Sequence, residues 1–279
     1  MQAIIDYFEN IPSSHRSVML ISGITFFWIL ESGIPLFKFK YNKWKHALPN
    51  LFFTLTTIII NFGLASLLFL TSEWVMTNEF GILHWLPDMT LGLKVLVGVM
   101  LLDFFGAYLA HYVEHKVKPL WMVHLVHHSD HKVDTTTANR HHPIESVVRF
   151  AFTLLGVFIV GVPVAYIMIY QALSLIFTQF THANVKLNKR VDKLLSYVII
   201  SPDMHKIHHH YVLPYTDSNY GNIFSIWDRL FGTYMYMNRE DIVYGVDVFF
   251  DEENNSKIGH LLKQPFQKYQ RPTIKPIKD

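Results

Sequence analysis

Residues 147–180, VVRFAFTLLGVFIVGVPVAYIMIYQALSLIFTQF, form the apolar stretch that decides the fold. The stretch holds a single charged residue, Arg149. About 20 apolar residues suffice to cross ~30 Å of hydrocarbon, so this stretch is too long for one crossing. Because Gly161 and Pro163 interrupt it near the middle, it predicts either one kinked helix or a tight helical hairpin.

Three further apolar stretches precede it, at 17–37, 51–72 and 91–110. Each has the length of a membrane span and is apolar on all sides, which favours lipid over the core of a large soluble protein. The composition agrees, since 51% of the residues are hydrophobic and only 16% are charged. A soluble domain usually has about 25% charged residues. The sequence therefore predicts an all-α fold, an integral membrane helical bundle of about four spans.

The loops between these stretches differ in charge. The loop at 37–46, FKFKYNKWKH, holds four lysines, whereas the loop at 73–89, EWVMTNEFGILHWLPDM, holds acids and no Lys or Arg. The positive-inside rule places the first loop in the cytoplasm, and the third apolar stretch then returns to that side. We expect the polar segments 111–146 and 181–279 to form a cytoplasmic, histidine-rich helical cap.

Composition excludes several functions and suggests a division of the chain. There is no cysteine, which rules out disulfides, an iron–sulfur cluster and a cysteine nucleophile. The net charge of +2, without a basic patch, gives no indication of nucleic-acid binding. We predict N-terminal transmembrane helices (1–90), a region of histidine motifs (91–240) and a polar C-terminal tail (241–279).

Histidine is the residue type in excess, with 17 in the chain. On a helix, positions i, i+3 and i+4 lie on one side, so the spacings HxxxH and HxxHH are expected to bring imidazoles together. Neutral imidazole is a common ligand for iron, copper, nickel and zinc, and polar groups at the membrane ends of apolar helices are usually functional. Nine such nitrogens exceed the needs of one metal ion, so two ions are predicted. The predicted ligands are His111, His115, His124, His127, His128, His182, His205, His208 and His209.

Other polar residues near these motifs are candidates to support the ligands. A ligating histidine usually donates its second ring N–H to a carboxylate or a carbonyl. Asp103 lies within an apolar stretch, two turns before His111, and needs a partner. His142 and Asn184 are further candidates, as ligands or as hydrogen-bond partners of ligands, whereas His141 is interpreted as a bystander. The carboxylates expected either to bind ligand N–H groups or to act as ordinary caps and solvated charges are Glu114, Asp130, Asp134, Glu145 and Asp203.

The order HxxxH, HxxHH and HxxHH resembles that of the fatty acid hydroxylase/sterol desaturase superfamily, and in particular its bacterial sterol-desaturase-like branch. The resemblance covers roughly residues 95–240 and implies that the nine histidines hold a non-haem di-iron centre. In some relatives a second histidine follows four positions after the one matched by His182. Here that position is Lys186, so His142 or water would complete the ligand set. The matching segments are LWMVHLVHHSDHKVDTTTANRHHPIE (120–145), FTQFTHANV (177–185) and ISPDMHKIHHHYVLPYTDSNYGNIFSIWDRLFGTY (200–234).

The resemblance implies an oxidoreductase that uses O2 and external electrons to hydroxylate or desaturate a C–H bond of a lipid, such as a fatty acyl chain or a sterol. The electrons would come from a ferredoxin-like or cytochrome b5-like carrier with its reductase, because the chain has neither cysteines nor a glycine-rich dinucleotide motif. Two alternatives remain: a membrane protein that handles metal, and a di-zinc hydrolase. Ligands gathered at one membrane end disfavour transport, and the absence of HExxH disfavours hydrolysis.

Two segments outside the histidine motifs also carry expectations. The aromatic-rich segment 222–237, NIFSIWDRLFGTYMYM, is interpreted either as a lid in the lipid headgroup plane or as a core-packing segment. The chain from Asp251 onward is polar and is expected to be a solvated extension.

Overall fold

The computed structural model describes residues 1–249 and 251–269. Helices make up 69% of the structure, and no β-strand forms among the described residues, so the predicted all-α fold is confirmed. The helices of the first half are α1 (Gln2–Glu9), α2 (Ser13–Gly33), α3 (Lys43–Thr77), α4 (Ile82–Trp85), α5 (Leu91–Asp103), the π-helical η1 (Phe104–Leu109), α6 (Ala110–Lys116), α7 (Lys118–His128) and η2 (Thr135–Asn139). Those of the second half are α8 (Pro143–Val160), α9 (Val164–His182), α10 (Lys189–Leu195), α11 (Pro202–His208), η3 (Tyr215–Asp217), α12 (Ile226–Leu230), η4 (Arg239–Asp241), η5 (Asn254–Ser256), α13 (Ile258–Lys263) and η6 (Gln264–Phe266).

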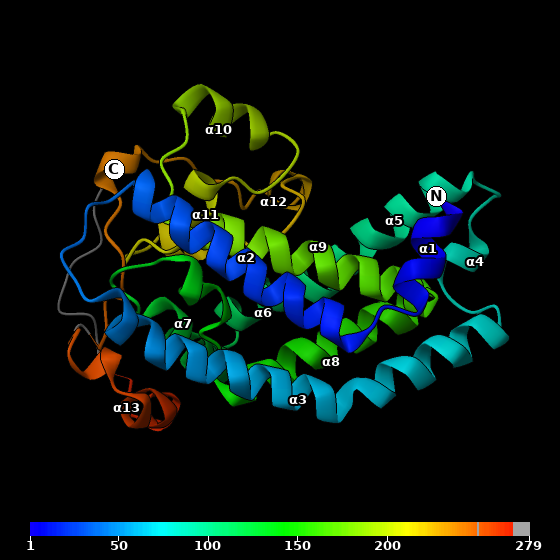
Figure 1. The fold of residues 1–279 in the computed structure, drawn as a ribbon, viewed down its shortest axis with the longest axis horizontal. Helices are drawn as coiled ribbons and strands as arrows, with labels where there is room; N and C mark the ends of the chain where they lie inside the picture. Colours follow the sequence, from blue (N-terminus) through cyan, green and yellow to red (C-terminus); the bar gives the residue numbers. More distant parts are fainter. Residues whose placement is uncertain (250, 270–279) are drawn as a thin grey trace.

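The long helices lie along the longest axis of the molecule, and the cap helices α7, α11 and α13 gather at one end (Figure 1). The N-terminus, α1 and α4 lie at the opposite end. The lysine-rich loop 37–46 belongs to the cap end, because Lys43 Nζ lies 3.0 Å from Glu31 Oε1 and Tyr41 donates to Asp134 at 2.9 Å. The loop and the histidine motifs therefore share one end of the bundle, as the charge pattern predicted.

Four helical segments are long and apolar enough to cross a membrane. Their number matches the prediction, but their assignment differs. The predicted span 17–37 falls largely in α2, and α2 is not one of the four. It nevertheless packs along α9, where Gln179 donates to the carbonyl of Leu20 at 3.3 Å. The four segments are Lys43–Trp85, Leu91–Lys116, Pro143–Val160 and Val164–His182.

The stretch 147–180 folds as a helical hairpin rather than as one kinked helix. The ring of His127 contacts two other rings. Its centroid lies 4.9 Å from that of His141, just before α8, and 5.0 Å from that of His182, at the end of α9. The start of α8 and the end of α9 are therefore neighbours, and the two helices run antiparallel. The hairpin returns the chain to the cap end.

The turn of this hairpin depends on glycine. Gly161 ends α8 in the left-handed conformation, with φ of 72°, and Pro163 precedes the first residue of α9. A Cβ atom added at Gly161 would lie 2.2 Å from the carbonyl oxygen of Phe80. Both the backbone conformation and the close approach of the loop after α3 therefore require glycine here.

The C-terminal segment packs on the cap as far as the structure describes it. Leu261 of α13 is fully buried against Phe53 and Val126, and Val246 and Val248 lie in a second apolar cluster. The expectation of a solvated extension is therefore wrong for the described residues after Asp251, since a few apolar side chains suffice to anchor a polar segment. The rest of the predicted tail, 270–279, lies outside the described residues.

Candidate metal centre

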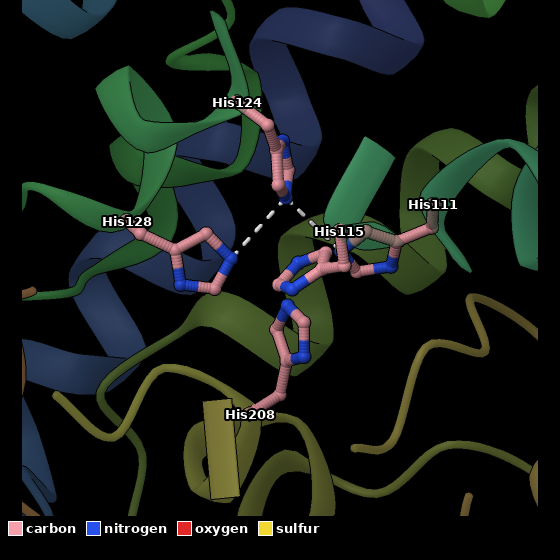
Figure 2. Close-up of side chains that lie close together, drawn as sticks. All are labelled: His111, His115, His124, His128 and His208. Atoms are coloured by element: carbon pink, nitrogen blue, oxygen red, sulfur yellow. Dashed lines mark hydrogen bonds between the residues drawn. The ribbon is translucent and has the colours of Figure 1, made fainter. Parts of the chain in front are cut away.

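The structure brings all nine predicted ligand histidines into two buried groups. Within each group, one ring nitrogen of every member lies within 4.8 Å of those of the others. Figure 2 shows the five rings of the first group turned toward a common centre. The first group is His111, His115, His124, His128 and His208, and the second group is His127, His182, His205 and His209.

Each HxxHH motif supplies both groups. On α7, His124 and His128 enter the first group, whereas His127 enters the second. This follows from helix geometry, because positions i and i+4 are about 40° apart while i+3 is displaced about 60° to the other side of i. In the motif of α11 the assignment is reversed: His205 and His209 enter the second group, and His208 enters the first. The expectation that the three histidines of a motif converge on one face is therefore wrong, and the two motifs join the groups instead.

Backbone carbonyls hold three of the rings. A carbonyl oxygen only accepts, so the Nδ1 atom of each ring must be the protonated donor and its Nε2 atom carries a bare lone pair. These Nε2 atoms face the interior of the groups. The donor–acceptor pairs are His111 Nδ1 with Tyr220 O (2.8 Å), His208 Nδ1 with Ser218 O (2.6 Å) and His182 Nδ1 with Thr178 O (2.7 Å).

Carboxylates hold two more rings of the first group. His124 Nδ1 lies 2.7 Å from Glu145 Oε1, and His115 Nδ1 lies 3.3 Å from Asp217 Oδ1. Burial alone would raise the pKa of Asp217, but hydrogen bonds from His115 and Lys116 hold it well below its ordinary value. Asp217 is therefore an acceptor at neutral pH and keeps the proton of His115 on Nδ1.

The nitrogens that face one another cannot all be satisfied by hydrogen bonds. His111 and His124 both commit their protons to outside acceptors, yet their Nε2 atoms are 3.1 Å apart. In the second group, His182 Nε2 lies 3.0–3.2 Å from the Nε2 atoms of His127, His205 and His209. Two nitrogens at right angles on a metal, with bonds of about 2.1 Å, are about 3.0 Å apart. Both groups therefore fit a metal ion, which would turn this repulsion into attraction.

Burial keeps neutral the six histidines that the cap contributes to the two groups. Desolvation, followed by the neighbouring imidazoles, lowers the pKa of His127, His128 and His205 far below the ordinary value near 6.5. Desolvation also lowers the pKa of the other cap histidines of the two groups: His124, His208 and His209. A histidine binds metal in its neutral form, so no proton has to be displaced from these rings at pH 7.

Two further candidates lie outside both groups. His142 caps α8: its Nδ1 accepts from Ile144 N at 3.2 Å and its Nε2 donates to Leu262 O at 3.3 Å. Both ring nitrogens are thus engaged away from the ligands. The side chain of Asn184 pairs with the backbone of Phe37 at 2.8 and 2.9 Å, so it joins the loop after α2 to the end of α9.

The partners of Asp103 lie in the aromatic-rich segment 222–237 and are not histidines. Its carboxylate accepts from the backbone N–H groups of Ile223 and Phe224 and from Trp227 Nε1, each at 3.2 Å. It therefore fixes the aromatic-rich segment to the second membrane-length segment, Leu91–Lys116. We predicted that Asp103 needs a hydrogen-bond partner, but the partners found are not among the nine candidate metal ligands.

The other predicted carboxylates divide in the same way. Glu145 binds His124, and Glu114 lies 3.9 Å from the same ring while pairing with Arg149 at 2.7 Å. The remaining three hold the loops around the groups and touch none of the nine ligand histidines through a hydrogen bond in the described part of the chain. They are Asp130, which pairs with His46; Asp134, which caps η2; and Asp203, which pairs with Arg239.

Two residues beside these groups, Asp217 and His141, were not predicted from the sequence. Asp217 stands 102 positions after His115 in the chain, so no local spacing could link them. His141, interpreted as a bystander, contacts His127 and lies 3.7 Å from Glu145 Oε1. Its position inside the RHHPIE segment (140–145) was the signal available in the sequence.

A bundle of membrane-length helices with two groups of convergent histidines on its cap is the arrangement of a multi-pass membrane protein whose histidines could bind metal. Residues 95–233 match the family described as fatty acid hydroxylase, and the chain belongs to this family. The resemblance found in the motifs is thereby confirmed.

Two curated relatives of the chain have names that describe lipid-modifying enzymes. The chain is 29% identical over 152 residues to the ornithine lipid hydroxylase OlsE of Rhizobium tropici, a match that covers 54% of this chain and 45% of that protein. It is also 29% identical over 143 residues to the alkylglycerol monooxygenase of Homo sapiens, covering 51% of this chain and 31% of that protein. The chain thus matches less than half the length of these relatives. No solved structure matches it.

Proposed function

We propose that this protein is a membrane non-haem di-iron oxygenase that hydroxylates a C–H bond of a lipid. The observation that carries the proposal is the facing pair of unprotonated nitrogens, His111 Nε2 and His124 Nε2, with the equivalent cluster around His182. Neutral imidazole suits iron, and two groups suit two ions. The two bound irons would supply the activation of O2, with one oxygen atom entering the lipid and the other leaving as water after two electrons and two protons are consumed.

The chain's own residues prepare the site for this chemistry. The carbonyls of Tyr220 and Ser218 and the carboxylates of Glu145 and Asp217 keep protons on the outer ring nitrogens, so that the inner nitrogens stay free for metal. Trp121 covers the first group, with its ring centroid 4.7 Å from that of His115. Because every ligand is buried, water is largely excluded from the place where a reactive oxidant would form.

The names of the relatives favour hydroxylation over desaturation. One relative is named a lipid hydroxylase and the other a monooxygenase, and both names describe insertion of oxygen. Desaturation by the same centre stays the alternative outcome. We place the site on the cytoplasmic side of a multi-pass protein because the four-lysine loop lies at the cap end. A ferredoxin-like or cytochrome b5-like carrier is proposed as the external donor, and 1–90, 91–240 and 241–279 as the membrane, catalytic and C-terminal parts.

Metal content and spectroscopy test the proposal. Protein purified in mild detergent from cells grown on iron-57 should contain about two irons per chain and show a coupled diferric Mössbauer spectrum. Reductant and a lipid substrate should then start O2 uptake. His208→Ala should abolish this uptake, while His260→Ala, in α13 outside both groups, should leave it unchanged. Stable zinc without O2 uptake would instead support a hydrolase, and exchangeable metal without turnover would support a metal-handling protein.

A further inference from the structure

An apolar surface stands outside the four membrane-length segments. Leu194 on α10 and Leu230 on α12 are 70% and 68% exposed. A soluble surface rarely gathers so many large apolar side chains in one place. We call this surface the α10–α12 face. Its exposed apolar members are Val191, Leu194, Tyr197, Val198, Leu230 and Phe231.

The position of this surface suits contact with a bilayer. Figure 1 shows α10 standing off the flank of the bundle, beside α11 and above α9, and not at the tip of the cap. The long axis of the bundle is the direction in which the membrane-length helices run. A segment that projects sideways from that axis, near the level of the histidine motifs, would therefore meet a membrane surface.

The α10–α12 face continues the surface of the second membrane-length segment, Leu91–Lys116. The ring of Phe231 stacks on Phe104 and on Tyr108, each at a centroid distance of 5.5 Å. Arg229 Nη2 donates to the carbonyl of Ser196 at 2.8 Å, which joins α12 to the end of α10. The two helices and the span therefore form one connected surface, and a bilayer around the span would reach the face as well.

The charges on this face match a membrane surface. Arg190 and Lys193 are exposed on α10, next to its apolar residues. The guanidinium of Arg229 lies over the rings of Tyr197 and Tyr234, at 5.1 and 4.2 Å. Cations and tyrosines bordering an apolar surface are typical of segments that lie in the headgroup layer and contact anionic lipid.

We propose that the α10–α12 face lies in the lipid interface on the cap side of the membrane. Leu194, Val198 and Leu230 enter the boundary between headgroups and acyl chains, and Arg190 and Lys193 contact lipid phosphates. A row of rings links the face to the first histidine group. Phe231 of the face stacks on Tyr108, the ring of Tyr108 lies 6.3 Å from that of Tyr220, and the ring of Tyr220 lies 5.0 Å from that of His115. The bilayer is thereby held close to the side of the candidate metal centre.

The absence of cysteine permits a direct test by site-directed spin labelling. Nitroxide labels are placed at Leu194→Cys and Leu230→Cys in the full chain, reconstituted into vesicles of phosphatidylcholine and phosphatidylglycerol. Phe62→Cys, on α3 and 83% exposed, is the lipid reference, and Glu253→Cys, with a side chain 81% exposed, is the aqueous reference. Power-saturation measurements by electron paramagnetic resonance compare the access of each label to O2, which concentrates in hydrocarbon, with its access to a water-soluble nickel chelate.

We expect the ratio of O2 access to nickel access at both test positions to exceed that of Glu253→Cys several-fold and to approach that of Phe62→Cys. A ratio equal to that of Glu253→Cys would overturn the proposal. Low access to both reagents would also overturn it, because it would indicate a protein partner or a second copy on the face. If Leu230→Cys does not fold, Val198→Cys takes its place.

A charge variant tests the lipid contact separately. Arg190→Gln with Lys193→Gln should move the label at Leu194→Cys toward water in anionic vesicles, with a smaller change in neutral ones. No change in either vesicle would remove the phosphate contacts from the proposal. These measurements need neither bound metal nor turnover, so they can fail or succeed independently of the proposed oxygenase function.

Discussion

Glu145→Gln tests whether the hydrogen bond behind a ligand tunes the candidate metal centre. Glu145 Oε1 accepts from His124 Nδ1 at 2.7 Å inside the protein, and the same carboxylate pairs with Arg149 at 3.0 Å. The amide keeps the shape of the side chain but loses its negative charge. Arg149 retains Glu114 at 2.7 Å, so the substitution does not leave a buried cation unpaired.

The expected effect falls on the first histidine group. Loss of a carboxylate behind a ligating histidine typically lowers metal affinity about 10- to 100-fold. This corresponds to about 1.4–2.7 kcal/mol of binding free energy. Among the described residues, Glu145 forms no hydrogen bond or ion pair with the histidines of the second group, so we expect the affinity of that group to stay within about twofold of the unsubstituted protein.

Chelator competition measures this effect. Metal-depleted protein in detergent is titrated with Fe(II) or Co(II) against a chelator of known affinity, and the two binding steps are fitted separately. Asp103→Asn is the matched control, since Asp103 is an equally buried carboxylate that binds Ile223, Phe224 and Trp227 and, within residues 1–249 and 251–269, none of the nine histidines. Equal affinities in Glu145→Gln and the unsubstituted protein, or an equal loss in Asp103→Asn, would refute the reasoning.

Three further predictions follow from the same geometry. His208→Ala and His205→Ala should each lose about one metal equivalent, from the first and second groups respectively, by elemental analysis; loss of both ions from either variant would contradict two separable sites. Burial lowers the pKa of the six cap histidines of the two groups, so in acid the unfolded chain binds more protons than the folded protein. The melting temperature of metal-depleted protein should therefore fall as the pH drops below about 6.5. A melting temperature that does not change between about pH 8 and pH 5 would argue against this prediction. Gly161→Ala should lower the stability by at least about 1–2 kcal/mol, because φ is positive and a Cβ atom would collide with Phe80 O; the control Gly63→Ala, in an open helix position, should be neutral or stabilising in the same thermal unfolding assay.

The membrane-length helices, the helical fold and the set of histidines that gather in the two groups were predicted from local patterns in the sequence. Apolar stretches the length of a bilayer, and histidines three or four positions apart, are properties of adjacent residues and need no tertiary knowledge. The weaker assignments were those in which polar residues share a helix with apolar ones. Residues 17–37 were predicted as a span although Arg16 and Glu31 reduce the apolar content of α2, and the few apolar residues after Asp251 were overlooked.

Only the tertiary structure decided how the histidines are shared between two groups and what holds each ring. A helical motif fixes the angles between His124, His127 and His128, but the packing of α6, α9 and α11 around it determines which ring meets which partner. The contact of His115 with Asp217 joins residues 102 positions apart, and a carbonyl acceptor leaves no trace in its residue type. Sequence by itself therefore determined the candidate ligands and their membrane-length helices. The long-range packing of the chain decided the division into two groups and the tautomer of the five imidazoles that have an outside hydrogen-bond acceptor.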